Sequence, residues 1–350
     1  MSKKRLDYLD MAKGVGIFLV VLGHIEYLEE SAMRWIYSFH MPLFFVIGGI
    51  LSYVKRDRGL SFQEGVKKKA SGILVPYASF SLILLTMRVF EYFFQPERVT
   101  GRELLTQFID AVTGYGLHIL WFLPVYFLSG ILFFFLCRRF EDKPYGGYGP
   151  GIAVFGFALL ALGVIHSLGF EISALQEQSF LLRIGCNVLI TVLRALSILP
   201  FFLIGWLYAG TIRHGSLRKG RLFASGALLL FLGSYVALKT DILDLHYLYI
   251  SPVHYVTAAM SCIGLLNLLR ALPVSRALSY LGRNSLIIMC THGTFYVLYY
   301  VSLGMFFVRK LIPMTEAVLY GGIAVMVCVA EIPVIYIFNR YFNHLLGRKS

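Results

Sequence analysis

About ten apolar runs, spread along almost the whole chain, constrain the fold more than any other feature of this sequence. Each run is long enough to cross a hydrocarbon layer of ~30 Å as a helix that rises ~1.5 Å per residue. Backbone groups inside lipid have no water to bond, and a helix satisfies them within its own segment. The sequence therefore predicts an all-α polytopic membrane protein of about ten transmembrane helices, centred on Leu19, Ile47, Leu82, Val125, Leu159, Ile198, Leu230, Ala259, Phe295 and Met326.

The composition agrees with this fold class. Of the 350 residues, 58% are hydrophobic and 15% are charged, and the mean hydropathy is +0.72. Water-soluble domains average about 45–50% apolar and about 25% charged residues. The apolar runs leave no room for a soluble catalytic domain, and no linker divides the chain. We therefore expect residues 1–350 to form a single integral-membrane domain.

The net charge of +13 indicates topology rather than nucleic-acid binding. When the loops are numbered alternately from a cytoplasmic N-terminus, most of the 32 lysines and arginines fall on the inner side and most acidic residues on the outer side. This distribution follows the positive-inside rule. It predicts cytoplasmic termini and a multi-pass protein of a cell membrane, such as the bacterial cytoplasmic membrane. The lipid bilayer is then a partner, nucleic acid is not, and the oligomeric state stays open.

The longest inner loop, from Lys55 to Gly72, contains the basic run Lys67, Lys68 and Lys69. We expect it to form a short amphipathic helix on the inner membrane surface. Such a basic run can anchor the chain to anionic lipid, or it can bind a ligand, and the sequence leaves both alternatives open.

A small set of polar residues inside the apolar runs carries the candidate chemistry. In the first run, Asp10, Lys13 and His24 fall on one helical stripe, and His24 lies roughly 16 Å beyond Lys13, near the middle of the membrane. Ionisable groups at membrane depth are costly and often mark functional sites. Four further candidates begin or lie within later runs: His40, Trp121, His292 and Glu331.

Each candidate also has a purely structural alternative. His24 and His292 can hydrogen-bond a neighbouring helix, and Trp121 can be an interfacial aromatic residue. Glu331 needs a cationic or hydrogen-bonding partner, or a raised pKa. Three arginines within or beside the apolar runs can reach the membrane surface by snorkelling: Arg88, Arg183 and Arg194.

Two classes of catalytic site lack their sequence signatures. The chain has no HExxH motif, no cysteine pair with metal-ligand spacing and no histidine pair four residues apart, so we predict no metal site. It also lacks the GxSxG motif of serine hydrolases. No tightly bound cofactor is expected.

The polar set fits one reaction well. A neutral imidazole can act as a general base that takes a proton from a hydroxyl as its oxygen attacks an activated acyl group. Cations on the cytoplasmic side can hold the phosphates of a coenzyme A thioester. The predicted topology then places the acyl donor inside, a hydroxylated acceptor outside, and His24 between them.

Several blocks of the sequence closely resemble the acyltransferase-3 family, and above all its fucose 4-O-acetylase-like polysaccharide O-acetyltransferases. The resemblance covers nearly the whole chain and is carried by Asp10–Gly14 through Gly23–His24, Ser38–Phe45, Trp121–Leu123, Pro200–Gly205 and Leu281–Leu286 followed by His292. It implies a fold of about ten helices. It also implies transfer of acyl groups from cytoplasmic acyl-CoA to extracytoplasmic glycans, lipids or related acceptors.

The hallmark of that family is an arginine, ten intervening residues and an essential histidine. Here His24 takes the place of the histidine, and Lys13 stands where arginine is usual. Lysine keeps the charge but loses the bidentate fork of a guanidinium. The family often has two basic residues three apart before the third span; Lys69 fits the first place and Gly72 occupies the second.

We therefore predict a membrane O-acyltransferase that moves an acyl group, expected to be acetyl, from acetyl-CoA as co-substrate to a hydroxyl of a surface glycan or lipid-linked sugar. His24 is the predicted general base. The predicted donor-binding residues are Lys13, Lys69, Asp10 (which orients Lys13) and Arg283. The predicted substrate contacts are His40, Trp121, His292 and Glu331.

Two alternatives to this function remain. One is a polytopic transporter or exporter of an organic acid or glycan precursor, which predicts broken helices at matching positions in two inverted halves. The other is a non-catalytic partner of a polysaccharide machine, which would leave the stripe of Lys13 and His24 unexplained.

Overall fold

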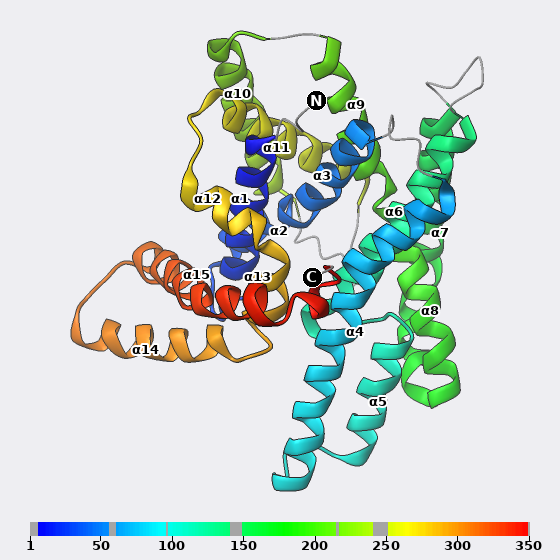
Figure 1. Cartoon of the computed structure of the whole chain (residues 1–350), viewed down its shortest axis with the longest axis vertical. Helices are drawn as coiled ribbons and strands as arrows, with labels where there is room; N and C mark the ends of the chain where they lie inside the picture. Colours follow the sequence, from blue (N-terminus) through cyan, green and yellow to red (C-terminus); the bar gives the residue numbers. More distant parts are fainter. Residues whose placement is uncertain are drawn as a thin grey trace. The chain divides into compact units, whose positions relative to one another are not determined.

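The computed structural model describes residues 6–55, 61–95, 97–140, 149–214, 217–240 and 251–348. Every regular element in these ranges is a helix, so the predicted all-α fold is confirmed (Figure 1). The chain forms two compact units. The first contains Met1–Val54, Ile204–Asp244 and Tyr249–Asn339, and the second contains Lys55–Leu203, Leu245–Leu248 and Arg340–Ser350. The prediction of one domain over residues 1–350 stays a prediction.

Eight helical segments of the described chain are long and apolar enough to cross a membrane, and each contains one of the predicted centres. They are Glu30–Val54, Phe62–Phe94, His118–Arg139, Gly151–Leu168, Phe180–Ile212, Lys219–Ala237, Pro252–Ala271 and Glu316–Tyr341. The protein is therefore a polytopic α-helical membrane protein.

The other two predicted runs fold into shorter helices. The run centred on Leu19 forms α1 (Asp7–Gly23), which has 17 residues. The run centred on Phe295 is interrupted between α13 (Ser285–Thr291) and α14 (Val297–Leu311). The interruption ends at Tyr296, whose φ of 56° lies in the left-handed region.

The first unit is built around α1. This helix packs against α11 (Pro252–Ala271), α12 (Arg276–Arg283) and α13, and α10 (Lys219–Ala237) packs against α11. Its other helices are α2 (Glu30–Tyr37), α3 (His40–Lys55), most of α9 (Leu199–His214), α14 and α15 (Glu316–Tyr341, which lies in this unit as far as Asn339).

Two glycines allow α1 and α12 to approach closely. A Cβ atom on Gly14 would overlap the carbonyl oxygen of Leu278, and a Cβ atom on Gly282 would overlap the carbonyl oxygen of Asp10. Backbones come this near only where no side chain separates them, as at the small-residue contacts of membrane helices. The two glycines therefore fix α12 against the segment of α1 that carries Asp10 and Lys13.

The second unit is formed by α4 (Phe62–Phe94), α5 (Gly101–Val112), the short 3₁₀ helix η2 (His118–Trp121), α6 (Phe122–Phe140), α7 (Gly149–Gln178), α8 (Phe180–Ser197) and η3 (Asn343–Leu346). In Figure 1, α4 is a long helix beside α5 and α6, and α7 lies along α8, as their contacts also show.

The basic run Lys67–Lys69 belongs to α4. Ser61 and Glu64 form a capping box that starts this helix, which then continues without a break to Phe94. The expectation of a separate short amphipathic helix over residues 55–72 is therefore wrong, because the apolar run continues the helix that the cap begins. Residues 56–60 lie outside the described part of the chain.

A second capping box starts α5. The side chain of Thr100 accepts a hydrogen bond from the backbone of Glu103, whose carboxylate accepts one from the backbone of Thr100. The backbone hydrogen bond from Thr100, followed by the side-chain bond, holds the pKa of Glu103 below its usual value. This local pairing fixes where α5 begins.

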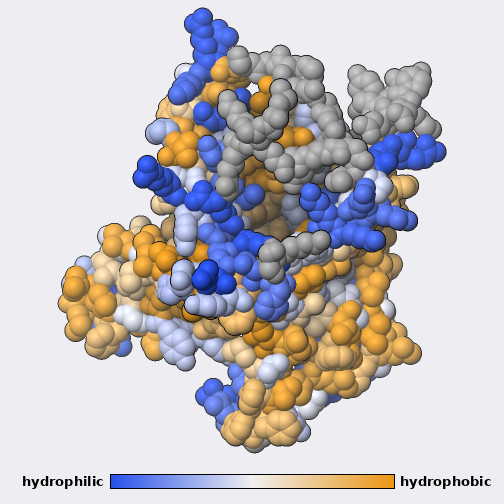
Figure 2. All heavy atoms as spheres, in the orientation of Figure 1, coloured by the Kyte–Doolittle hydropathy of each residue, from blue (hydrophilic) through white to orange (hydrophobic). Residues whose placement is uncertain are grey.

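Large apolar side chains cover the outer faces of both units, as a membrane environment requires. In Figure 2, orange predominates on the visible surface around α14, α5 and α8 and along the lower part of α4. Exposed examples are Leu181 (80%), Phe93 (70%) and Phe307 (62%). In a soluble monomer such faces would be exposed to water, whereas lipid tails solvate them well.

Candidate functional site

His24 lies at the end of α1 rather than within a longer helix. The helix stops at Gly23, and His24 is the C-cap residue, with its backbone N–H turned back to the carbonyls of Val21 and Leu22. Its Nδ1 lies 2.7 Å from the carbonyl oxygen of Val20, and its side chain is exposed. The prediction that His24 lies within the first helix is wrong, because the chain turns at this residue and the imidazole bonds one of the last carbonyls of the helix.

Three of the predicted site histidines share one hydrogen-bond pattern. The Nδ1 atoms of His24, His40 and His292 lie 2.7, 2.8 and 2.7 Å from the carbonyl oxygens four residues earlier in the chain. A carbonyl oxygen only accepts, so in each neutral ring Nδ1 carries the hydrogen and Nε2 carries the lone pair. All three imidazoles are therefore fixed with a proton-accepting nitrogen at the outer end of the ring.

These histidines come from different helices but form one cluster in the first unit. The ring centres of His24 and His292 are 5.2 Å apart in an edge-to-face arrangement. His40, the first residue of α3, is within electrostatic range of His24 and also of His254 in α11. His40, His254 and His292 are buried, with 2%, 1% and 0% of their surface exposed, whereas His24 is exposed. His24 is therefore the member of this cluster that a substrate can reach.

Sequence reasoning missed His254. It is the third residue of α11, which begins at Pro252 with Ser251 as its N-cap. The predicted topology could have placed His254 at the same membrane depth as His40, because the runs that begin near these two residues both start on the outer side of the membrane. The first run, which contains His24, ends on that same side.

The predicted residue Glu331 of α15 contacts the neighbour of His292 in the chain. Glu331 is fully buried, and its Oε2 accepts a hydrogen bond of 2.6 Å from the hydroxyl of Thr291, the neighbour of His292. The expectation that Glu331 needs a hydrogen-bonding partner is confirmed. This bond ties α15 to the end of α13, where the His292 ring is held.

Lys13 and Asp10 form the predicted ion pair on α1. The Nζ of Lys13 lies 3.8 Å from Oδ1 of Asp10, one turn earlier, and both side chains are largely buried. Arg283 is exposed at the end of α12, the helix that the two glycines hold against this part of α1. Asp10, Lys13 and Arg283 thus belong to one helix pair.

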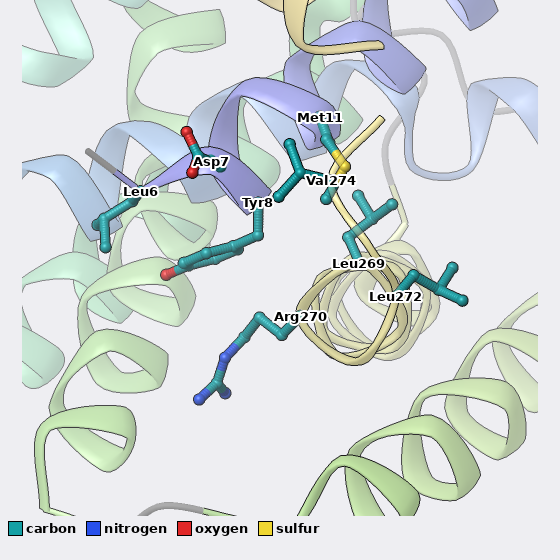
Figure 3. Close-up of a pocket in the computed structure, with 8 residues that line it drawn as sticks. All are labelled: Leu6, Asp7, Tyr8, Met11, Leu269, Arg270, Leu272 and Val274. Atoms are coloured by element: carbon teal, nitrogen blue, oxygen red, sulfur yellow. The ribbon is translucent and has the colours of Figure 1, made fainter. Parts of the chain in front are cut away.

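A pocket opens at the start of α1, beside the end of α11 (Figure 3). It has a volume of about 290 Å³, and the side chains of Tyr8 and Arg270 project into it from these two helices. The guanidinium of Arg270 lies 5.9 Å from the ring centre of Tyr8 and donates a hydrogen bond of 3.5 Å to the hydroxyl of Tyr208. Sequence reasoning did not single out Arg270, although it counts among the inner cations of the predicted topology.

Lys69 and Trp121 lie in the second unit. Lys69 is half-buried in α4, with its Nζ close to Gly130 of α6, whereas Lys67 and Lys68 are exposed. Trp121 ends η2 and is followed by α6, so it begins the fourth span as predicted. Of the basic run, Lys69 is thus the residue that packs against a neighbouring helix.

Arg194 packs against the ring of Trp121 and is itself buried. It is 1% exposed, and its guanidinium carbon lies 4.7 Å from the ring centre of Tyr115 and 5.2 Å from that of Trp121. The expectation that Arg194 snorkels to the surface is wrong, because the two aromatic rings and the Tyr115 carbonyl take up its charge inside the unit. Arg183 instead pairs with the carboxylate of Asp110 through two hydrogen bonds of 2.8 and 2.7 Å.

The exposed imidazole of His24 could accept and release a proton. Among the described residues, no three His, Cys, Asp or Glu side chains are placed to hold a metal ion together. A fixed Nε2 lone pair on an exposed ring, backed by buried neutral rings, is the arrangement expected of a general base.

Comparison with known proteins places the chain in a family. The sequence profile of an acyltransferase domain, that of the acyltransferase-3 family, matches residues 6–338. A nodulation protein NolL from Mesorhizobium japonicum is 33% identical over 133 residues, which cover 35% of this chain and 34% of that relative. The match thus spans about a third of the relative's length. No solved structure matches the chain. The profile covers nearly the whole sequence, and the chain therefore belongs to the acyltransferase-3 family of membrane acyltransferases.

Proposed function

We propose that this acyltransferase is an O-acetyltransferase of the cell membrane that modifies a surface glycan or a lipid-linked sugar. Acetyl-CoA on the cytoplasmic side is the donor, and a hydroxyl on the outer side is the acceptor. The observation that carries the proposal is the state of His24: its ring is exposed, and its Nδ1 donates to the carbonyl of Val20, so the lone pair of the neutral ring lies on Nε2.

In the proposed reaction, Nε2 of His24 takes the proton of the acceptor hydroxyl as the oxygen bonds to the thioester carbonyl carbon. The C–S bond then breaks, and the proton passes from His24 to the thiolate sulfur. The products are an acetyl ester and coenzyme A, and His24 returns to its neutral form. A positioned base of this kind contributes about 10²–10⁴-fold to the rate.

The donor side is proposed to be cationic. In the first unit, Lys13, with Asp10 holding its ammonium, and Arg283 would contact the phosphates of the donor. That Lys69 of the second unit binds the donor stays a prediction. The pocket at Arg270 and Tyr8 adds a guanidinium and an aromatic face at the start of α1. That His40, His292 and Glu331 of the first unit and Trp121 of the second contact the acceptor stays a prediction.

The decisive experiment replaces His24. His24→Ala removes the base, and His24→Gln keeps hydrogen bonding but cannot accept the proton. Both variants should lose surface acetylation about 10²-fold or more while the protein still accumulates in the membrane. His166→Gln is the matched control, because His166 is an exposed histidine of α7 in the second unit.

The measurement is alkali-labile acetate on the surface glycan of cells that carry each variant. Wild-type acetylation by His24→Gln would show that His24 is only a structural hydrogen-bonding residue. The transporter alternative would then be favoured, since it needs no proton acceptor at this position.

A further inference from the structure

In the described part of the chain, three residues other than glycine have a positive φ, and each lies close in sequence to a predicted site residue. They are Tyr27 (φ 65°), His118 (46°) and Tyr296 (56°), which lie within four residues of His24, Trp121 and His292, respectively. For a bulky side chain this backbone conformation is rare and unfavourable, and it is often found at functional sites. Of the three, Tyr27 follows the proposed general base in the turn at the end of α1.

Tyr27 is open to solvent in a polar segment. Ile25 is 3% exposed and anchors the turn in the first unit, whereas Glu26 and Glu29, before and after Tyr27, are exposed. Carboxylates are costly in hydrocarbon, so these two glutamates place the segment in an aqueous environment. Tyr27 itself is 81% exposed. Its ring is therefore accessible to a ligand that comes from water.

The backbone of Tyr27 is held by a neighbouring helix. Tyr320, a buried residue of α15, donates a hydrogen bond of 2.7 Å from its hydroxyl to the carbonyl oxygen of Tyr27. A chain of three residues spans at most ~11 Å even when it is fully extended, so the backbone of Tyr27 stays within that distance of the backbone of His24. An aromatic side chain on a fixed backbone loses little conformational freedom when it binds a ligand.

The residues of this turn match the chemistry of a sugar. One face of a pyranose ring carries C–H groups and packs on an aromatic ring, and the hydroxyls at its edge donate hydrogen bonds to carboxylates. Tyr27 provides the aromatic ring, and the exposed carboxylate of Glu26 adjoins it in the chain. Glu26 and Glu29 are both acidic, so a phosphate-bearing ligand would be repelled here. The turn thus favours a neutral sugar.

We propose that Tyr27 binds a neutral pyranose unit of the acceptor by stacking on its apolar face, an inference that rests on the proposed function. Because Tyr27 and His24 share one turn, the sugar on Tyr27 and the hydroxyl that His24 deprotonates belong to the same glycan. The stacking contact is the same before and during acyl transfer. It therefore lowers the KM for the acceptor and leaves the maximal rate unchanged.

Four substitutions at Tyr27 separate the role of the ring from that of the backbone. Tyr27→Phe and Tyr27→Trp keep an aromatic ring. Tyr27→Asn and Tyr27→Gly remove the ring, and both new residues accept a positive φ more readily than tyrosine does. Tyr341→Asn is the matched control, because Tyr341 is a 63% exposed tyrosine of the second unit.

The kinetic assay uses the purified full-length protein in detergent, where both sides of the protein are accessible. The donor is radiolabelled acetyl-CoA, and the acceptor is the surface glycan of the host after mild alkali has removed its acetyl esters. Tyr27→Asn and Tyr27→Gly should raise the KM for this glycan about five- to tenfold, with the maximal rate and the KM for acetyl-CoA unchanged. Tyr27→Phe, Tyr27→Trp and Tyr341→Asn should keep the wild-type KM.

A second measurement detects binding without chemistry. In a His24→Gln background, Tyr27→Trp places a fluorescent ring at the proposed site. Its emission should change when the alkali-treated glycan is added and should not change with acetyl-CoA. The same titration of His24→Gln alone gives the signal of the three native tryptophans, which is subtracted.

A wild-type KM for the glycan in both Tyr27→Asn and Tyr27→Gly would overturn the proposal. An equal rise in the KM for acetyl-CoA, or a fall in the maximal rate of all four variants, would also overturn it, because the effect would then belong to the shape of the turn. Failure of the proposed function gives a different pattern, in which the wild type transfers no label or His24→Gln remains active. If His24→Gln is inactive while Tyr27→Asn has a normal KM, only the role of Tyr27 is refuted.

Discussion

At the scale of single residues, Lys13 is where this chain departs from the usual pattern of its family. A lysine in place of arginine keeps the positive charge but presents a single ammonium, which Asp10 holds at 3.8 Å. The ion pair is largely buried, so the ammonium is fixed at one place on α1 rather than free in solvent. A fixed point charge suits one phosphate group of a donor.

We expect Lys13→Ala to raise the KM for acetyl-CoA about tenfold, because a charge-assisted hydrogen bond contributes about 1.5–3 kcal/mol. Lys13→Arg should retain near-normal affinity, since the charge is conserved. The KM is measured in everted membranes, with Lys68→Ala as the control because Lys68 is an exposed residue of the other unit. An unchanged KM in both Lys13→Ala and Lys69→Ala would remove the proposed cationic donor site.

The sequence predicted which residues form the site better than it predicted their hydrogen bonds and their burial. His24, His40 and His292 stand out because ionisable groups are rare in apolar runs. Their common hydrogen bond to the carbonyl four residues earlier is a rotamer choice that no sequence pattern encodes. For the same reason the sequence could not show that His292 is shielded while His24 is exposed.

At the scale of helices, apolar length predicted where helices lie better than where they end. Eight of the predicted centres fall within membrane-length helices, but α1 stops at Gly23 and the ninth run breaks after Thr291. At both points the apolar run becomes more polar, at His24 and Glu26 in the first case and at His292 to Thr294 in the second, so each end coincides with a local drop in hydropathy that the length of the whole run does not show. In contrast, the capping box of Ser61 and Glu64 starts α4 with a local signal that is visible in the sequence.

The contact of α1 with α12 can be tested by adding one methyl group. Gly14→Ala places a Cβ against the carbonyl oxygen of Leu278 and should destabilise the fold by about 1–3 kcal/mol. Gly72→Ala is the matched control, because Gly72 is a helical glycine of α4 with no atom within 4 Å of its Cβ position. It should be neutral or stabilising by up to about 1 kcal/mol.

The readout is the thermal unfolding midpoint of each purified variant in the same detergent. Gly14→Ala should unfold at a lower temperature than the wild type, and Gly72→Ala should not. Equal midpoints for the two variants would mean that α1 and α12 can separate enough to admit the methyl group.

At the scale of the whole molecule, the charge distribution predicts which side of the membrane each loop occupies. The turn between the first two runs, around residues 29–34, should lie on the outer side of the membrane. The basic start of α4 should lie inside. Arg56 and Arg58, which also support this orientation, lie outside the described part of the chain.

Labelling of intact cells tests this orientation. A cysteine placed by Ser31→Cys should react with a membrane-impermeant thiol reagent from outside, because Ser31 is an exposed residue of α2. Lys68→Cys should react only after permeabilisation. The background should be low, since four of the five native cysteines are buried and Cys137 is partly buried. The reverse labelling pattern would invert the proposed sides of donor and acceptor.

The length of α4 links the protein to the thickness of its bilayer. Its 33 residues extend ~50 Å as a helix, whereas the hydrocarbon layer is ~30 Å thick, and the polar residues are concentrated in its first turns. A rigid helix of this kind adapts to a thicker or thinner layer by tilting or by sliding along its axis. Lys69 moves with it, since no loop separates this lysine from the apolar part of the helix. The height of Lys69 relative to the lipid phosphates is therefore set by the acyl-chain length of the surrounding lipids as well as by the protein fold.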